Sequence, residues 1–483
     1  MQGVPGPVPA DTSGAAREPF SEDTSAMTSM SKVAVEVTNR RYQKDPFWGG
    51  PKGIAYGLLV GALPIQQANL YPDQGSTYFV GAFHLPKGSS LTIRGEYPHL
   101  RYFSYTVAAQ LGGGQIGNGD FLRDDQIQPD EGSYNPFLPS ASRNVTPRKF
   151  TLQVVQGPPP TNPEDRPSNT LYTYSDSEEA RIHLAIRNYI SDVGYDGTGN
   201  AELQQVDVYG LPEVTLNLPD GRKLTGQAMA DAVRASKAQE TPGYSRETWL
   251  WLARSASDPI NAPAVREPAF QRFWNTSYSV TGSFVPDPAM RVHIFPATGE
   301  GGFANNPDTI YLMAAFSLDF GKVVVIKAKM PTHQRTRHRQ ESWTPNTQVR
   351  YWSVTAGASA PSGVGWASIF DEEVPLDEHG NFTLVMSWPE DRPSNATREC
   401  GVAWLDFGGG EGHYIGARTW VNSVYIRYMN ANPAWPQSPE KIPRPNTENP
   451  VPQDAKIMQE YYPRASYMSK ADFEALGSKA ARK

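Results

Sequence analysis

The hexapeptide Glu164-Asp-Arg-Pro-Ser-Asn169 recurs unchanged as Glu390-Asp-Arg-Pro-Ser-Asn395 in the second half of the chain. Other blocks resemble one another in the same order on either side of the two copies. They are Tyr78–Phe83 with Tyr311–Phe316, Leu91–Pro98 with Val324–Pro331, Arg101–Ser104 with Arg350–Ser353, Lys149–Leu152 with Asn381–Leu384, and Ala185–Tyr189 with Tyr425–Met429. Chance rarely keeps so many matches in order, and loops of unequal length account for their changing separation. The sequence therefore predicts an internal duplication.

The matched blocks have the composition of β-strands. They are short, contain many β-branched and aromatic residues, and are bounded by Gly, Pro, Asn or Asp. The chain contains 42 glycines and 43 prolines without a regular period, which suits many turns between short strands. We therefore expect a mostly β protein with one antiparallel, jelly-roll-like β-sandwich in each half.

The segments outside the matched blocks have a different character. Leu224–Ser236 and Ser245–Ala256 have helical periodicity, with Thr225 as an N-cap for the first. The Pro-rich segment Pro433–Pro452 is expected to be extended over a surface, followed by two short helices, the second beginning at Ser469. The predicted organisation is a disordered tail (1–44), a first β-sandwich (45–222), a helical linker (223–300), a second β-sandwich (301–435) and a C-terminal extension (436–483).

Composition excludes several classes of function. The net charge of −6 offers no basic surface for nucleic acid, and no apolar run is long enough to span a membrane. Cys400 is the single cysteine, so no internal disulfide can form. The first 41 residues lack the apolar core of a secretion signal, so we expect a soluble cytoplasmic protein.

Three segments carry a resemblance to a known family: Pro129–Phe137, Asn306–Tyr311 and Gly380–Leu384. With the blocks around Arg350 and Arg427, they are similar to a large bacterial family of paired domains of unknown function. The resemblance covers roughly residues 45–435. It implies paired β-sandwiches and a homo-oligomer, and it implies no particular activity. The long loop 332–349 departs from the usual pattern.

No motif in the sequence identifies a reaction. Gly112–Gly117 has the letters G-x-G-x-x-G, but no helical pattern follows to bind a dinucleotide, so a turn is the better interpretation. The twin hexapeptides favour a duplicated turn over a duplicated active site. Arg187 and Arg427 occupy matching strand positions, where burial would require partners, and Asp165 and Asp391 are the partners expected.

Three residues are candidates for acid or base catalysis. Asp308 stands just before a strand, where loops often carry function, although ordinary turn chemistry explains it equally well. Glu411 and His413 follow three successive glycines and would form an acid/base pair, with a mobile hairpin tip as the alternative.

Arginine and tyrosine residues are the candidates for ligand binding. Arg335 and Arg337 alternate in the loop 332–349 and, if extended, project to one side together with His333. Such a face suits an anionic ligand, whereas a surface loop, a subunit contact or a metal site are the alternatives. The ligand-binding residues expected are Asn306, Tyr311, Arg350, Tyr351, Arg427, Arg335 and Arg337, and no metal site is predicted.

These candidates support three hypotheses of function. The first is a small-molecule-binding protein, with or without catalysis, that takes an anionic or polyhydroxylated ligand in a cleft between the two β domains. The second is a structural protein that builds oligomers. The third is a glycan-binding or glycan-processing protein, suggested by the aromatic content of 11%. No cofactor can be named.

Overall fold

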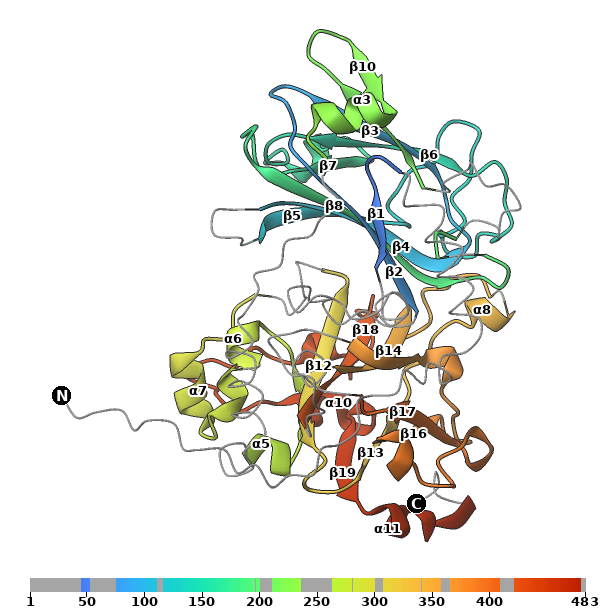
Figure 1. Ribbon diagram of the computed structural model, residues 1–483, viewed down its shortest axis with the longest axis vertical. Helices are drawn as coiled ribbons and strands as arrows, with labels where there is room; N and C mark the ends of the chain where they lie inside the picture. The colour runs from blue at the N-terminus through green and yellow to red at the C-terminus, as the bar shows by residue number, and fades with distance from the viewer. Residues whose placement is uncertain are drawn as a thin grey trace, which may run out of the picture.

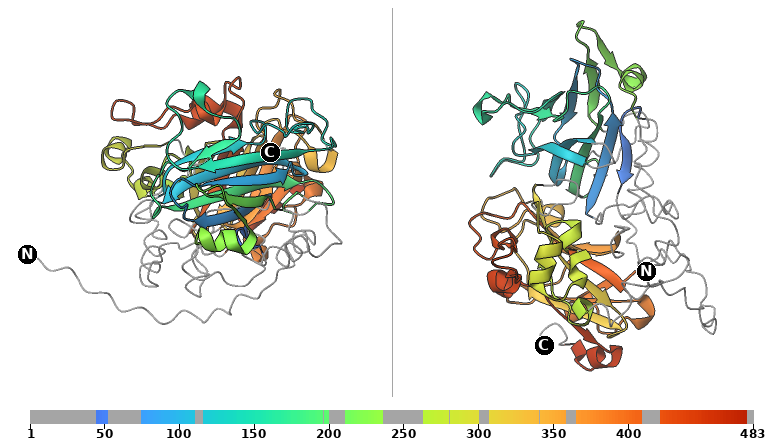
Figure 2. Two further views of the ribbon diagram at one scale, coloured as in Figure 1. Left: turned by 90° about the horizontal axis from the view of Figure 1, so that it is seen from above. Right: turned by 90° about the vertical axis from the view of Figure 1, so that its left-hand side faces the viewer.

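The computed structural model describes residues 45–52, 75–110, 116–195, 197–199, 211–235, 263–279, 281–299, 307–339, 341–357, 365–408 and 421–478. Within them, four β-sheets pair into two sandwiches, which confirms the expected mostly β fold. The sheets lie in layers along the longest axis of the molecule (Figure 1). A view turned by 90° separates the sandwich of the first half from that of the second (Figure 2).

The first sandwich consists of an outer and an inner sheet. The first outer sheet has the order β10 (Lys223–Thr225), β9 (Glu213–Asn217), β3 (Ser90–Glu96), β6 (Lys149–Val155) and β7 (Thr170–Tyr172). The first inner sheet has the order β1 (Gly49–Lys52), β2 (Ser76–Phe83), β8 (Arg181–Ser191), β4 (Leu100–Gln110) and β5 (Ile116–Arg123). Because side chains alternate along a strand, Leu184 and Ile186 of β8 enter the core of this sandwich, while Arg187 and Tyr189 point toward the second half.

The second sandwich repeats this plan. The second inner sheet has the order β11 (Gln271–Arg272), β12 (Thr309–Ser317), β18 (Val421–Met429), β14 (Tyr351–Gly357) and β15 (Gly365–Phe370). The second outer sheet has the order β17 (Val402–Asp406), β16 (Asn381–Ser387), β13 (Val323–Lys329) and β19 (Arg464–Met468). Leu312, Val354 and Ile426 fill the core between these two sheets. The two inner sheets face each other across the boundary between the halves, where Tyr102 and Tyr351 belong to one buried cluster.

The register of the two inner sheets also corresponds. Tyr78 lies opposite Arg187 in the first half, as Tyr311 lies opposite Arg427 in the second. In each outer sheet, the strand after the hexapeptide pairs in parallel, β7 with β6 and β17 with β16. The expectation of purely antiparallel sandwiches was therefore wrong at these two edges, because each connection is long enough to cross over. The two hexapeptides share a conformation at their start, since each begins within a 3₁₀ helix, η3 (Pro163–Asp165) or η6 (Pro389–Asp391). Their last residues differ, because Asn169 has a positive φ of 57° and Asn395 does not.

The predicted helical linker is partly built into the sheets. Its first residues form β10, and the helix expected at Leu224–Ser236 is the shorter α3 (Gly226–Ala232). Thr225 occupies the N-cap position of α3 without a side-chain capping hydrogen bond. The helix expected at Ser245–Ala256 lies outside the described residues. The other short helices of this region are α5 (Pro263–Arg266), α6 (Thr276–Ser279), η4 (Thr281–Phe284) and α7 (Pro288–Ile294).

The C-terminal extension is an integral part of the second sandwich. After η8 (Pro439–Lys441), α10 (Asp454–Met458) and η9 (Gln459–Tyr461), strand β19 adds an edge to the second outer sheet beside β13. Helix α11 (Lys470–Glu474) begins at Ser469, whose side chain accepts the Asp472 N–H as expected, and buries Phe473 against β13. Sequence patterning missed β19 because Arg464–Met468 is short and half-exposed. The remaining short elements are η5 (Asp371–Glu373), η7 (Arg398–Cys400) and α8 (Thr336–Arg339).

Asp454 connects this extension to the start of the second half. Its carboxylate accepts the Arg272 backbone N–H at 2.6 Å, and burial raises its pKa to about 6. The carboxyl group is therefore protonated in the folded protein at pH values where the unfolded chain, with a pKa of about 3.9, has lost that proton. Because the folded protein binds this proton more tightly than the unfolded chain does, the proton stabilises the fold at low pH. This stabilisation is lost as the pH rises through the folded pKa.

Asp454→Asn tests this linkage. The amide keeps an acceptor for Arg272 but does not titrate. Between about pH 4 and about pH 6, the free energy of unfolding of the wild type is expected to fall relative to that of the variant. The expected fall is at most ~3 kcal/mol, or ~1.4 kcal/mol per pH unit. Urea denaturation of both proteins across this range measures the difference, and parallel pH profiles would contradict a raised pKa at Asp454.

Among the described residues, no helix is both long and apolar enough to cross a membrane.

Candidate functional site

Asp308 is buried at the boundary between the two inner sheets. Its two carboxylate oxygens accept hydrogen bonds from the Arg187 Nη2 at 2.8 and 2.6 Å, and the Tyr102 hydroxyl donates to it as well. Burial works to lower the pKa of Arg187, but the Asp308 carboxylate and the neighbouring tyrosines together raise that pKa above its usual value. The pKa of Tyr102 is raised by burial and by the same carboxylate. Asp308 thus binds the side chains of two residues of the first half, Arg187 and Tyr102.

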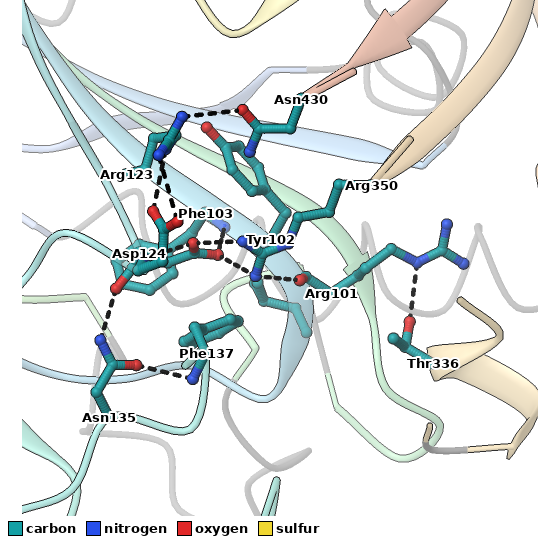
Figure 3. A network of polar contacts seen from close by, with 12 residues as sticks. Arg101, Tyr102, Phe103, Arg123, Asp124, Asn135, Phe137, Thr336, Arg350 and Asn430 are labelled. Atoms are coloured by element: carbon teal, nitrogen blue, oxygen red, sulfur yellow. Dashed lines mark hydrogen bonds and ion pairs between the residues drawn. The ribbon is translucent and has the colours of Figure 1, made fainter. Parts of the chain in front are cut away.

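Two further ion pairs cross the boundary in opposite directions. The Arg350 guanidinium donates to both oxygens of Asp124 at 2.9 and 2.8 Å, a contact seen in Figure 3. Arg101 donates to both oxygens of Asp371 at 2.8 and 2.6 Å and also binds Glu372. Arg101 and Arg350 occupy matching sequence blocks, and Asp124 and Asp371 each follow the last strand of an inner sheet. The two pairs are therefore equivalent contacts made from the two sides.

The backbone holds the two carboxylates in the same way. Asp124 accepts the Phe103 N–H at 3.1 Å, and Asp371 accepts the Trp352 N–H at 3.0 Å. Burial raises the pKa of Asp124 to about 7, while the neighbouring Arg350 guanidinium opposes that rise. Both Arg101 and Arg350 are among the largest fully buried side chains. Such pairs fix the geometry of the boundary, because separating them would leave charges without partners in a dry interior.

The structure brings five of the predicted site residues to this boundary. They are Asp308, Tyr311, Arg350, Tyr351 and Arg427, all of them buried. The Arg427 guanidinium lies over the rings of Tyr189 and Tyr311, at 5.5 and 5.3 Å. Three others, Asn306, Glu411 and His413, lie outside the described residues. The expected pairing of Arg187 with Asp165 was wrong, since Arg187 faces the boundary and binds Asp308.

The loop 332–349 lies against the first half. Arg335 and Arg337 belong to a segment that turns into α8, so they do not alternate along an extended chain as expected. Helical turns place successive residues about 100° apart, which separates these side chains. Arg337 donates to the Ser191 carbonyl at 2.6 Å, and the Trp343 carbonyl accepts the Ser140 N–H at 3.0 Å. Within the described residues, no group of three or more side chains could hold a metal ion.

A cavity of about 770 Å³ opens at one end of the first sandwich. Its walls come from both sheets of the sandwich, from α3 and from the segment 45–48. Buried aromatic rings form its floor: Phe47, Trp48, Phe103, Tyr105 and Phe150. Charged residues of the first outer sheet and beside it complete the lining, most of them with exposed side chains: Arg94, Glu96, Asp130, Lys149 and Glu213. The volume falls within the range of about 300–1,000 Å³ that is usual for ligand pockets.

Asn188 is a buried polar side chain in the wall of this cavity. On β8 it continues the series of core-facing residues that includes Leu184 and Ile186. Its Nδ2 donates to the Gly197 carbonyl at 3.0 Å, which fixes the orientation of the amide. Its Oδ1 is buried and has no hydrogen-bond partner in the described part of the chain. A buried acceptor without a donor is costly, so this oxygen suits a donor group of a ligand.

At the equivalent position of the second half, the described residues place an aromatic side chain where the first half has Asn188. Asn188 lies between Thr77 and Phe103 in the sheet register, and Tyr428 lies between Ile310 and Trp352. The Tyr428 ring is buried in the second core and packs against Trp435, which in turn packs against Tyr461. Large aromatic side chains thus fill the space in the second sandwich. The smaller Asn188 leaves part of that space open in the first.

Sequence reasoning missed the residues of the cavity and most of the ion pairs. A signal for Asn188 was present, since an amide at a core-facing position of an alternating strand is unusual. A signal for Arg101 was also present, because its block matches that of Arg350. Asp124 and Asp371 carried no comparable signal, since they stand in turns where aspartate is common.

Comparisons with solved structures find distant bacterial proteins. One is described as a putative uncharacterized protein from Burkholderia cenocepacia, with 11% sequence identity, a TM-score of 0.44, and coverage of 91% of this chain and 88% of that chain. Another is a protein from Vibrio parahaemolyticus, with 10% identity, a TM-score of 0.33, and coverage of 91% of this chain and 97% of that chain. The chain matches no protein-family model and no curated protein.

Proposed function

We propose that this protein binds a small polyhydroxylated molecule in the cavity of its first sandwich. The observation that carries the proposal is the buried Asn188 Oδ1, an acceptor without a donor in a cavity wall. This location replaces the cleft between the two β domains that sequence reasoning favoured. Buried ion pairs and tyrosines occupy the boundary between the halves. Of the arginines expected to bind a ligand there, Arg350 pairs with Asp124, and Arg427 lies over the rings of Tyr189 and Tyr311.

The lining of the cavity favours a ligand that donates hydrogen bonds. Four carboxylates, Asp45, Glu96, Asp130 and Glu213, stand against two cations, Arg94 and Lys149. An excess of acceptors and of negative charge disfavours an anionic ligand, whereas hydroxyl groups can donate to these oxygens. The aromatic floor offers apolar surface for the carbon skeleton of the same molecule. A sugar or polyol combines both properties.

Thermal denaturation of the full chain with a panel of sugars and polyols tests this proposal. A ligand present at about 100 times its Kd is expected to stabilise the folded protein by about 2.7 kcal/mol. Asn188→Leu keeps a similar side-chain size but removes the acceptor, and we expect it to weaken binding about tenfold. That factor corresponds to the ~1.4 kcal/mol typical of one hydrogen bond. Asn188→Tyr places in the cavity the residue found at the equivalent position of the second half, and is expected to abolish binding.

Asn422→Leu is the matched control. Asn422 is a buried β18 amide whose Oδ1 also lacks a partner in the described chain, but it lies in the second half, away from the cavity. This variant should lower the stability of the fold without lowering the affinity for the ligand. Binding that responds equally to Asn188→Leu and Asn422→Leu would argue against a site in the first sandwich. A flat response of the wild type to the whole panel would favour the structural, oligomer-building hypothesis.

We also infer that the two halves arose by duplication of one sandwich. Support comes from the corresponding strand orders of the inner sheets, the parallel outer strands and the 3₁₀ turn at the start of each hexapeptide. Under this view, the cavity is a feature that only one copy kept or acquired. The difference between Asn188 and Tyr428 is then the substitution that separates a binding sandwich from a filled one.

A further inference from the structure

Asp45 brings a buried negative charge to the wall of the cavity in the first sandwich. The residue is only 9% exposed, and its Oδ1 accepts the Phe47 and Trp48 backbone N–H groups at 2.8 Å each. No described residue donates a hydrogen bond to its Oδ2, and no described cation lies within ion-pair distance of this carboxylate. A buried carboxylate without a cation beside it is costly, so this position favours a cation supplied by a ligand.

The aromatic rings next to Asp45 suit a cation as well. The Trp48 indole N–H donates to the Pro212 carbonyl at 3.0 Å, and the Phe47 ring packs edge to face against the Trp48 ring at 5.0 Å. A Cβ atom at Gly81 would lie 2.5 Å from the Phe47 ring, so the glycine makes room for that ring. Because Asp45 is hydrogen-bonded to the backbone of both aromatic residues, its carboxylate is held close to them. Aromatic faces attract ammonium groups, and a carboxylate nearby strengthens this preference.

The other charged residues of the lining act in the same direction. Glu96 lies opposite Lys149 in the sheet register, but no ion pair joins them. Glu213 lies opposite Arg94, and these two side chains do not form an ion pair either. Neither glutamate has a hydrogen bond to another described residue. Four carboxylates against two cations leave a net charge of −2 in the lining, so the field at the cavity attracts a cation.

Asn188 limits the kind of cation. The residue is 4% exposed, lines the same cavity, and keeps its Oδ1 without a donor in the described part of the chain. A quaternary ammonium ion has no N–H group to offer, whereas a primary ammonium group has three and each hydroxyl group has one. The cavity therefore favours a ligand that combines a primary ammonium group with hydroxyl groups.

We propose that the ligand of this cavity is an amino sugar, whose protonated primary amine binds the Asp45 carboxylate. A hydroxyl group of the same molecule donates to the Asn188 Oδ1, and its carbon skeleton lies on the aromatic floor. This inference rests on the proposed binding of a polyhydroxylated molecule in the cavity, and it narrows that class to molecules that carry an amine.

Isothermal titration calorimetry of the full chain at low ionic strength tests the inference. The probes are glucosamine, galactosamine and mannosamine, each compared with its parent hexose. We expect the preferred amino sugar to bind at least tenfold more tightly than its parent, as one charge-assisted hydrogen bond provides. Asp45→Asn keeps a side-chain oxygen for the two backbone N–H groups but removes the charge. It should weaken amino-sugar binding about tenfold more than hexose binding, so that the preference disappears.

Asp377→Asn is the matched control. The Asp377 Oδ1 likewise accepts the N–H of the residue two positions later, His379, at 2.9 Å, but Asp377 lies in the second half, outside the cavity. This variant should change binding less than twofold. Circular dichroism and melting temperatures show whether Asp45→Asn is folded. If it is not, Glu213→Gln removes a charge from the lining at an exposed position and should reduce the amine preference about twofold to threefold.

The outcomes separate this inference from the proposed function. Amino sugars that bind no more tightly than their parent hexoses would overturn the inference and leave sugar binding in the cavity intact. If none of the six sugars binds, the proposed function fails and the inference fails with it. An amine preference that survives in folded Asp45→Asn, or that falls equally in Asp377→Asn, would overturn the assignment of the amine to Asp45.

Discussion

Asp308→Ala is expected to lower the free energy of unfolding by about 3–5 kcal/mol, because it leaves the Arg187 guanidinium buried and without its carboxylate. The Tyr102 hydroxyl and the Thr309 hydroxyl lose the same acceptor. Few single substitutions of a side chain this small reach such a value. The effect arises because Arg187 comes from the first half and Asp308 from the second, so the unpaired charge lies in the dry boundary between them. Urea denaturation with an intrinsic tryptophan signal measures the loss.

Asp220→Ala is the control for this experiment. Asp220 also pairs with an arginine, Arg222, but both side chains are more than half exposed, so the loss of stability should be far smaller than that of Asp308→Ala. The double variant Asp308→Leu with Arg187→Met should be more stable than Asp308→Ala alone, since it removes both buried charges together. If Asp308→Ala and Asp220→Ala cost the same, Asp308 does not anchor the two halves.

Much of the fold was accessible from the sequence, and the reason is physical. Strand blocks such as Phe150–Val155 and Val323–Ile326 alternate or run apolar because they cover a core, and this pattern is local. The hexapeptides were predicted as turns because Pro fixes φ and Asn and Asp close turns, which is again local chemistry. The same reasoning failed at β19. This strand forms by pairing with β13, which is distant in the sequence, so the residues of β19 themselves show little strand pattern.

The candidate site was harder to predict because its parts meet only through the fold. Arg350 and Arg427 were singled out by residue type, and the prediction that Arg427 is buried in a strand agrees with the structure. What the sequence could not supply was the partner: Asp124 stands far from Arg350 along the chain, in a turn that looks ordinary. Cavities are harder still, since the opening beside Asn188 depends on the sizes of side chains from several strands.

The two crossing ion pairs should differ in how their loss depends on pH. Arg101→Met leaves two carboxylates, Asp371 and Glu372, whose side chains are almost completely buried. Arg350→Met leaves only Asp124. Arg101→Met is expected to lose about 3–5 kcal/mol near neutral pH because it leaves buried charge without its partner. Arg350→Met should lose less at that pH, because the Asp124 carboxyl group is then protonated.

The pH dependence distinguishes Arg350→Met because the Asp124 pKa is already about 7 in the wild type. Removing the Arg350 cation, which lowers that pKa, raises it further. A carboxyl group with a raised folded pKa contributes stability that is lost as the pH rises through that value. Above about pH 7 the wild type has completed this loss, whereas the variant continues to lose up to ~1.4 kcal/mol per pH unit.

The difference in stability between wild type and Arg350→Met should therefore be constant below about pH 7 and should widen above it. Urea denaturation of the wild type and both variants between about pH 6 and about pH 9 measures this directly. A constant difference for Arg350→Met across the whole range would mean that Asp124 does not titrate near neutrality in the folded protein. Widening of the Arg350→Met difference that begins near pH 7 would assign the titration to Asp124, because the wild-type carboxyl group completes its own loss of stability at that pH.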